Sequence, residues 1–168
     1  TVTNLLKWSE DFSNAAWAKS NTTVTANTAT APDGTLTADF CVANTTAGVE
    51  HYMEQTVSDK NGTFTHSIYM KNAGAEITTL TLVAIGDAEG SVQGATITWD
   101  GSEIVSMTSS KVTPSYSDVG NGWYRVSITN TQSSVTYHRL RLYPSSVITL
   151  TTGDGIRGIY IWGAQVEQ

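Results

Sequence analysis

The chain has 168 residues, a formal net charge of −6 at pH 7 and only 14% charged residues. This length suits one domain and leaves little room for two. The acidic balance, without any basic run, excludes a surface that neutralises nucleic-acid phosphates, and no apolar stretch is long enough to span a membrane. We therefore expect residues 1–168 to form a single domain with no nucleic-acid or membrane partner.

Serine and threonine make up roughly a quarter of the chain, and threonine suits the half-exposed face of a sheet better than a helix interior. The composition therefore favours an all-β protein over a helical bundle. The single cysteine, Cys41, excludes an internal disulfide and any cysteine-based metal cluster. Because Cys41 lies in a mixed apolar run, we expect a buried and unreactive thiol.

Apolar and polar residues alternate along most of the chain, which is the pattern of half-buried strands. The one exception is residues 13–19, where Ser13 could cap a helical turn. Ten or so short strands without a βαβ rhythm predict an antiparallel sandwich or barrel. In chain order, the expected strands are residues 24–30, 35–42, 50–57, 64–71, 79–85, 95–99, 123–129, 135–143, 147–150 and 159–166.

Three of these strands, 64–71, 123–129 and 135–143, carry aromatic and cationic side chains on the face opposite their apolar one. An exposed tryptophan or tyrosine forfeits a large hydrophobic gain and therefore indicates a partner. Sugar rings stack on such rings, while cationic side chains donate to sugar hydroxyls. We therefore predict a glycan-binding face, biased towards acidic glycans, although a loop covering a ladder of cross-strand pairs would explain the same pattern. The predicted ligand-binding residues are Tyr69, Lys71, Trp123, Arg125, Tyr137, Arg139, Arg141 and Tyr143.

The other tryptophans have different predicted roles. Trp99 shares the parity of Ile97, which predicts a place in the core. Trp8, Trp17 and Trp162 lie near the termini, and we expect them to pack the ends of the fold.

Catalytic patterns are weak in this sequence. Most acidic residues lie in turns, no nucleophile elbow occurs, and the three histidines are not spaced for a metal. One cluster, Tyr137-His138-Arg139 with Gln55, has the residue types that small jelly-roll polysaccharide lyases use. Adjacent residues of a strand point to opposite faces, however, so Tyr137 and His138 cannot serve one pocket without a bulge. We therefore expect a protein that is not an enzyme, and we keep the lyase as the least favoured hypothesis.

Three segments at the two ends and in the middle of the chain are more distinctive. They read NLLKWSEDFSNAAW (residues 4–17), DVGNGWYRV (118–126) and GDG followed by GIYIWGAQVE (153–155 and 158–167). Together they resemble a family of jelly-roll domains found in bacteriophage virion proteins, which are similar to the concanavalin-like and galactose-binding-like carbohydrate-binding modules. The resemblance implies an all-β, two-sheet antiparallel β-sandwich (jelly roll).

The resemblance also implies a non-catalytic, sugar-binding module of a phage tail fibre, another virion protein or a polysaccharide-active chain. Its partners would be a polysaccharide or oligosaccharide and other domains of a larger chain, at an extracellular location or on the virion surface. The alternative is a structural or assembly domain of a phage tail protein, which would use the same aromatic face as a protein interface.

Related modules often hold a structural calcium ion between the N-terminal loop and the last strand. The matching positions here are Glu10, Asp11 and Gln165, and the acidic residue usual on the closing strand is absent. The resemblance therefore implies at most a structural Ca²⁺, held by oxygen ligands and without a role in chemistry. We expect no other cofactor.

Overall fold

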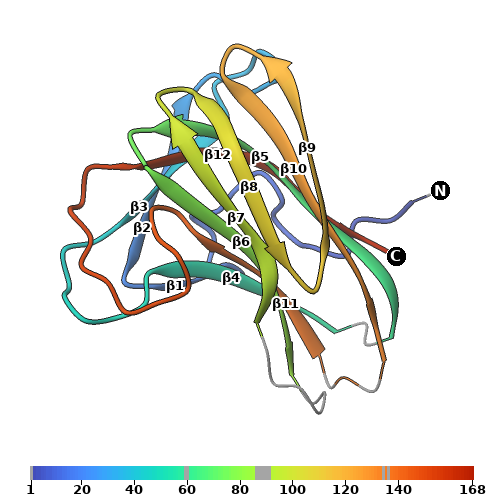
Figure 1. Ribbon diagram of the computed structural model, residues 1–168. Coiled ribbons are helices and arrows are strands. Elements are labelled where there is room, and N and C mark those ends of the chain that lie inside the picture. The colour runs from blue at the N-terminus through green and yellow to red at the C-terminus, as the bar shows by residue number, and fades with distance from the viewer. Residues whose placement is uncertain (1, 59–60, 86–91, 134, 136) are drawn as a thin grey trace.

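A computed structural model describes residues 2–58, 61–85, 92–133, 135 and 137–168. Within these ranges the regular elements are all strands, and none is a helix that could cross a membrane (Figure 1). The strands are β1 (Ala18–Ser20), β2 (Thr22–Ala29), β3 (Ala38–Ala43), β4 (Tyr52–Val57), β5 (Gly62–Ala73), β6 (Ile77–Ile85), β7 (Val92–Asp100), β8 (Glu103–Ser110), β9 (Thr113–Gly120), β10 (Trp123–Gln132), β11 (Tyr137–Tyr143) and β12 (Gly158–Glu167).

The strands form two six-stranded sheets in which the paired strands are antiparallel. Sheet A has the order β1-β4-β11-β6-β7-β8, and sheet B has the order β2-β3-β12-β5-β10-β9. Neighbours within a sheet are often distant in sequence, since the chain crosses repeatedly from one sheet to the other. This arrangement confirms the predicted two-sheet antiparallel β-sandwich.

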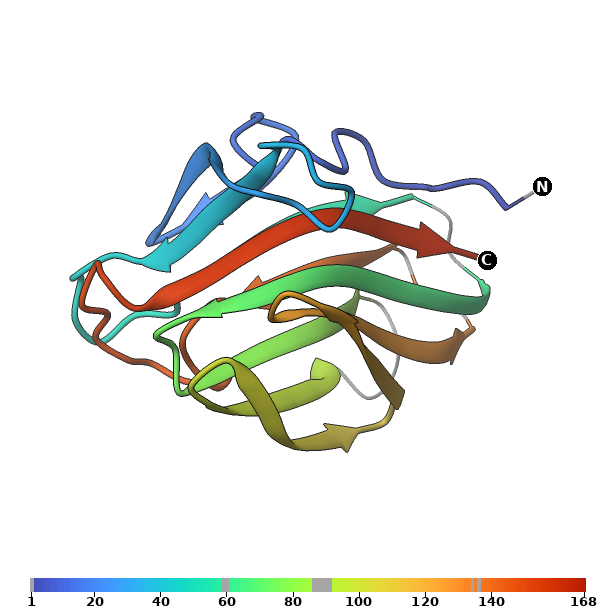
Figure 2. The same cartoon turned by 90° about the horizontal axis from the view of Figure 1, so that it is seen from above.

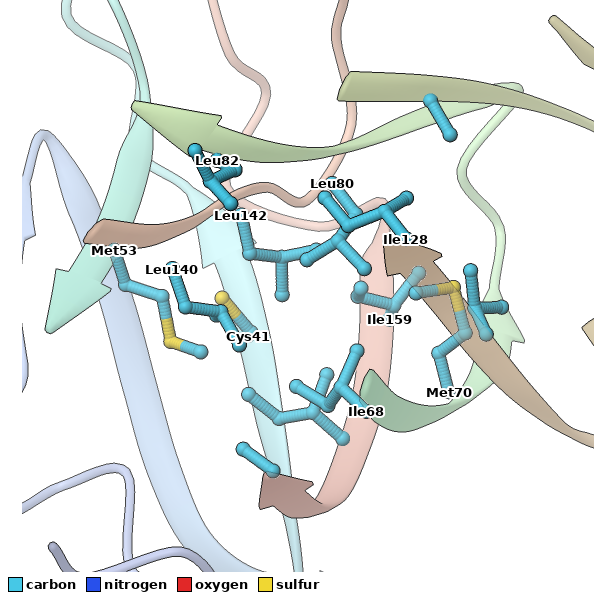
Figure 3. Close-up of a cluster of buried hydrophobic side chains, with 14 of the residues drawn as sticks. Cys41, Met53, Ile68, Met70, Leu80, Leu82, Ile128, Leu140, Leu142 and Ile159 are labelled. Carbon is cyan, nitrogen blue, oxygen red and sulfur yellow. The ribbon is translucent and has the colours of Figure 1, made fainter. Parts of the chain in front are cut away.

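The inner faces of the two sheets supply one hydrophobic core (Figure 3). Ile68 of β5 and Leu140 of β11 come from opposite sheets, and both are fully buried. Cys41 is also fully buried, and burial raises the pKa of its thiol to about 12, which confirms the expected unreactive cysteine. Trp99 is buried in this core, again as predicted.

The N-terminal segment, residues 4–17, lies along the edge between the two sheets, beside β12 (Figure 2). The amide of Leu5 donates to the carbonyl of Val166 at 2.9 Å. On the other side, Gln55 of β4 exchanges two hydrogen bonds with the backbone of Lys7, at 2.7 and 2.8 Å. Phe12 and Trp17 are buried with their ring centroids 4.9 Å apart, so this segment completes the core.

Two local expectations were wrong. Residues 13–19 form successive turns and the start of β1 instead of a helical turn, and residues 147–150 contain no strand. The sequence also gave no signal for β8 and β9. Nearly every residue of β9 is exposed, so this strand lacks the alternation that reveals a half-buried strand.

Candidate functional site

The eight residues predicted to bind a ligand lie on the outer faces of both sheets, which corrects the expectation of one shared face. Four of them lie in sheet B, where β5 and β10 are neighbours. There Tyr69 lies opposite Arg125, and Lys71 lies opposite Trp123. The other four lie on β11, which belongs to sheet A between β4 and β6. The split arises because alternation fixes the face of a side chain but not the sheet to which its strand belongs.

Trp123, predicted to be exposed, is only 2% exposed. It packs with Ala31 and Ala38, and its indole Nε1 donates to the carbonyl of Thr30 at 3.1 Å. The loop of residues 30–37 therefore lies over it, and the alternative of a covered aromatic residue holds at this position. The prediction that Trp123 stacks on a ligand is wrong, because the covering contact joins residues 93 positions apart and leaves no local signal.

We expect Trp123→Ala to lower the free energy of unfolding by about 3–5 kcal/mol, since it removes a large buried ring. Denaturant unfolding measures this change, and limited proteolysis should show faster cleavage within residues 30–37. Leu36→Ala is the matched control, because Leu36 lies in the same loop and is 62% exposed. Equal stability of the Trp123 variant and the wild-type protein would contradict the burial of Trp123 under this loop.

The outer face of sheet A carries a more open group of side chains. Tyr137, Arg139, Arg141 and Tyr143 follow one another along β11, and Glu54 of β4 lies directly opposite Arg141. The guanidinium of Arg141 lies 3.9 Å from the ring centroid of Tyr52, also on β4. We call these six residues, Tyr52, Glu54, Tyr137, Arg139, Arg141 and Tyr143, the sheet A face.

Charges on the sheet A face are paired. The carboxylate of Glu54 accepts from Arg141 Nε at 2.7 Å and lies 3.4 Å from Arg139 Nη1. Arg141 also donates to the Tyr143 hydroxyl, which donates to Glu50 at 3.1 Å. Both guanidinium groups share the carboxylate of Glu54, and Glu50 accepts from the Tyr143 hydroxyl, so the positive charge behind the predicted preference for acidic glycans is partly offset here.

Burial shapes the protonation of this network. It raises the pKa of the Tyr143 hydroxyl to about 12, so this group stays a neutral donor. For Arg141, burial alone lowers the pKa, but the hydrogen bonds to Tyr143 and Glu54 outweigh it and the net pKa is raised. The face is therefore a fixed set of donors and acceptors at neutral pH.

One end of the sheet A face is closed and the other is open. Tyr143 is fully buried, whereas the Arg139 side chain is 25% exposed. Arg139 donates to the Tyr137 hydroxyl at 3.1 Å, but its Nε has no hydrogen-bond partner in the described structure. Because this Nε is buried, the exposed part of the Arg139 guanidinium is what remains open to a ligand.

A hollow of about 360 Å³ borders the open end, along β4 and the N-terminal segment. Glu54 belongs to both the hollow and the sheet A face, which makes them continuous. On the other side of β11, Thr81 of β6 lies opposite Gly94 of β7, and Thr96 lies two residues further along β7. A Cβ at Gly94 would lie 2.5 Å from the carbonyl oxygen of Leu80, so this position requires glycine. The lining residues of the hollow are Leu5, Lys7, Ala16, Ala18, Glu54, Gln55, Thr56 and Ser58.

The residues predicted to bind calcium do not form a complete site. Glu10 and Asp11 lie together in the N-terminal segment, and Gln165 lies on β12 opposite Ser67. Within the described ranges, no three acidic, histidine or cysteine side chains form a group that could hold a metal ion. Calcium would therefore depend on neutral oxygen ligands beside Glu10 and Asp11.

The N-terminal segment is instead held by side chains that sequence reasoning missed. The ammonium group of Lys19 donates to the carbonyl oxygens of Ser13 and Asn14, both at 3.0 Å. Asp39 is 1% exposed and accepts from the amides of Phe12 and Asn27, both at 2.9 Å. Burial raises the pKa of Asp39, although these two bonds act in the opposite direction. The sequence did contain one indication that Asp39 is buried. It lies two residues before the buried Cys41, and side chains two residues apart on a strand point to the same face.

The residues of the lyase hypothesis are divided between the core and the surface. His138 points into the core, where its ring nitrogen lies 3.2 Å from that of His66. Gln55 is buried and bonded to the backbone of Lys7, whereas Arg139 and Tyr137 lie on the outer face. The structure therefore does not bring these four types of side chain together in one pocket.

No protein-family model matches the sequence, and no curated protein is similar to it. Solved structures do share the fold. The enzymatically active domain of tailspike protein 4 from bacteriophage CBA120 matches with a TM-score of 0.57 and 16% identity, over 97% of this chain and 21% of that one. The module TmCBM61, in complex with β-1,4-galactotriose, matches with a TM-score of 0.54 and 11% identity, over 98% and 97%.

A third structure contains the CBM22-1 and GH10 modules of Clostridium thermocellum xylanase 10B with xylohexaose. It matches with a TM-score of 0.52 and 13% identity, over 91% of this chain and 26% of that one. The chain thus spans about a fifth of the tailspike domain and a quarter of the xylanase structure. These similarities confirm, at the level of the fold, the resemblance to jelly-roll carbohydrate-binding modules and to a phage virion protein.

Proposed function

We propose that this chain is a non-catalytic carbohydrate-binding module that holds a polysaccharide on the sheet A face. The observation that carries the proposal is the open end of that face, where the Arg139 side chain is 25% exposed and lies 4.9 Å from the ring centroid of Tyr137. Arg139 also lies opposite Thr56, which lines the hollow along β4. An aromatic ring beside fixed donors and acceptors is the composition that sugar rings and their hydroxyls require.

The comparisons support a neutral glycan as the ligand. Two of the structures that share the fold are complexes with neutral oligosaccharides, galactotriose and xylohexaose. The carboxylate of Glu54 offsets part of the positive charge of Arg139 and Arg141, which also favours a neutral sugar over an acidic one. The likeness to the tailspike domain supports a place on a virion or in a secreted polysaccharide-active protein, as one module of a larger chain.

Affinity electrophoresis in gels containing xylan, galactan, pectin or alginate tests the proposal. We expect retardation by a neutral polymer, with affinity for short oligosaccharides in the micromolar range or weaker, because hydroxyl bonds largely replace bonds to water. Arg139→Ala and Tyr137→Ala should each weaken binding about tenfold. Arg139→Ala leaves Glu54 paired with Arg141, so the fold should persist.

Arg125→Ala is the matched control, because Arg125 lies on the outer face of sheet B. Unchanged affinity in the Arg139 and Tyr137 variants would exclude the sheet A face as the site. If no polymer retards the protein, size-exclusion chromatography becomes decisive. An oligomer that dissociates in the Tyr137 variant would replace the proposal with an assembly interface.

A further inference from the structure

Of the five tryptophans, all of which the structure describes, Trp8 alone is exposed, at 57%. Its backbone also has a φ of 54°, in the left-handed region that a residue with a bulky side chain rarely adopts. We expected Trp8 to pack an end of the sandwich, and it does not. An indole held out in solvent at the cost of backbone strain calls for an explanation outside the fold.

Trp8 borders a hollow of about 330 Å³ between the N-terminal segment and the chain around β2 and β3. Figure 2 shows these segments on one side of the sandwich. We call the hollow beside Trp8 the Trp8 hollow. It is distinct from the hollow along β4, because the two share no lining residue. Its lining residues are Trp8, Ser9, Glu10, Asp11, Asn27 and Thr37.

The walls of the Trp8 hollow are fixed from behind by buried or half-buried groups. The indole of Trp17 donates to the carbonyl of Trp8 at 2.9 Å, and the indole of Trp162 donates to the Thr37 hydroxyl at 3.1 Å. The backbone N–H of Asn27 donates to the buried Asp39 carboxylate, so the Asn27 side chain takes no part in this bond. A ligand would therefore meet a preformed surface, which keeps the entropic cost of binding low.

The charge in the Trp8 hollow is of one sign. Two carboxylates line it and no cationic side chain does. Glu10 forms no ion pair with any residue that the structure describes, while Asp11 accepts a hydrogen bond from the Ser13 hydroxyl at 2.6 Å. Lys19, whose charge acts on Asp11, directs its ammonium group to the carbonyls of Ser13 and Asn14. Negative charge beside an exposed indole is the environment that binds an organic cation.

We propose that the Trp8 hollow is a second ligand site, specific for a sugar residue that carries a free ammonium group. The indole of Trp8 would stack on the sugar ring and attract its cation, Glu10 and Asp11 would pair with the ammonium group, and Asn27 and Thr37 would bond to hydroxyls. The site differs in location and charge from the sheet A face, so it stands or falls independently of the proposed function.

The test is titration of the protein with a glucosamine oligomer whose amino groups are protonated and, separately, with the N-acetylated oligomer of the same length. Tryptophan fluorescence and calorimetry report binding. We expect the glucosamine oligomer to bind at least about tenfold more tightly, with an affinity that falls as salt is added. Equal binding of the two oligomers would overturn the ammonium specificity.

Variants locate the site. Trp8→Ala keeps the carbonyl that accepts from Trp17, and it should lower the affinity for the glucosamine oligomer about tenfold or more. Glu10→Gln should weaken binding and reduce its dependence on salt. Leu36→Ala, an exposed apolar residue of the neighbouring loop, is the control that should bind normally. Binding that survives in both Trp8→Ala and Glu10→Gln would overturn the proposal, whatever the sheet A face binds.

Discussion

Replacing Asp39 with alanine is expected to lower the free energy of unfolding by about 2–4 kcal/mol, because it leaves two backbone amides without an acceptor. The carboxylate accepts from Phe12 in the N-terminal segment and from Asn27 in β2, both at 2.9 Å. A single buried side chain thus holds two segments against β3. Chemical denaturation followed by tryptophan fluorescence gives the change in free energy.

Asp33→Ala is the matched control for Asp39. Asp33 accepts from the amide and hydroxyl of Thr35 in an exposed turn, and an exposed turn of this kind contributes much less. Asp39→Asn keeps an acceptor oxygen for one of the two amides, so it should fall between the wild-type protein and the alanine variant. An alanine variant as stable as the Asp33 control would show that Asp39 does not hold the N-terminal segment.

Acidification is expected to destabilise the protein through the buried histidine pair. His66 and His138 come from opposite sheets, both are fully buried, and their ring nitrogens lie 3.2 Å apart. Burial, reinforced by the nearby His138, holds the pKa of His66 well below its ordinary value of 6.5. The remaining neighbours of His66 across the strands, Val166 and Ile128, are apolar.

The sign of the pH effect follows from proton binding. The unfolded chain binds a proton at His66 near pH 6.5 and the folded chain does not, so stability is complete above this pH and is lost as the pH falls. Each pH unit below this value should cost about 1.4 kcal/mol for His66 until its folded pKa is reached. Denaturant unfolding between about pH 7 and pH 5 measures this slope, above the range in which most carboxylates titrate.

His66→Leu removes the titrating group and should flatten the slope over the same pH range. A direct comparison of slopes is needed, because the substitution also changes packing and shifts the absolute stability. An unchanged slope in the variant would assign the acid sensitivity to other groups.

Alternation predicted which side chains of a strand enter the core, because this property depends only on the two-residue period. His138, Leu140 and Leu142 of β11 point inward, and Tyr137 and Arg139 point outward, as expected. The same pattern could not predict that β11 lies in the sheet opposite β5 and β10. Strand pairing depends on contacts between distant segments, so the predicted face divided into two.

The candidate site shows the same limit. Four of its six residues come from β11 and were predicted together. Tyr52 and Glu54 were missed as partners, because their place beside β11 depends on the pairing of β4 with β11. The sequence pattern could not predict which tryptophans are exposed either. Trp123 lies under a loop and Trp8 is open to solvent, the reverse of the expectation in each case, and loop positions decide both.

The exposed strand β9 ends sheet B, so one side of its backbone has no strand partner within the described structure. An unpaired edge of this kind is a template for a strand of a second molecule and hence for aggregation. Pro114 of β9 lies opposite Ile128 and has no backbone N–H that could donate to an incoming strand. Asp118 adds a negative charge further along β9. The missing N–H of Pro114 and the charge of Asp118 therefore both make this edge a poorer template for an incoming strand.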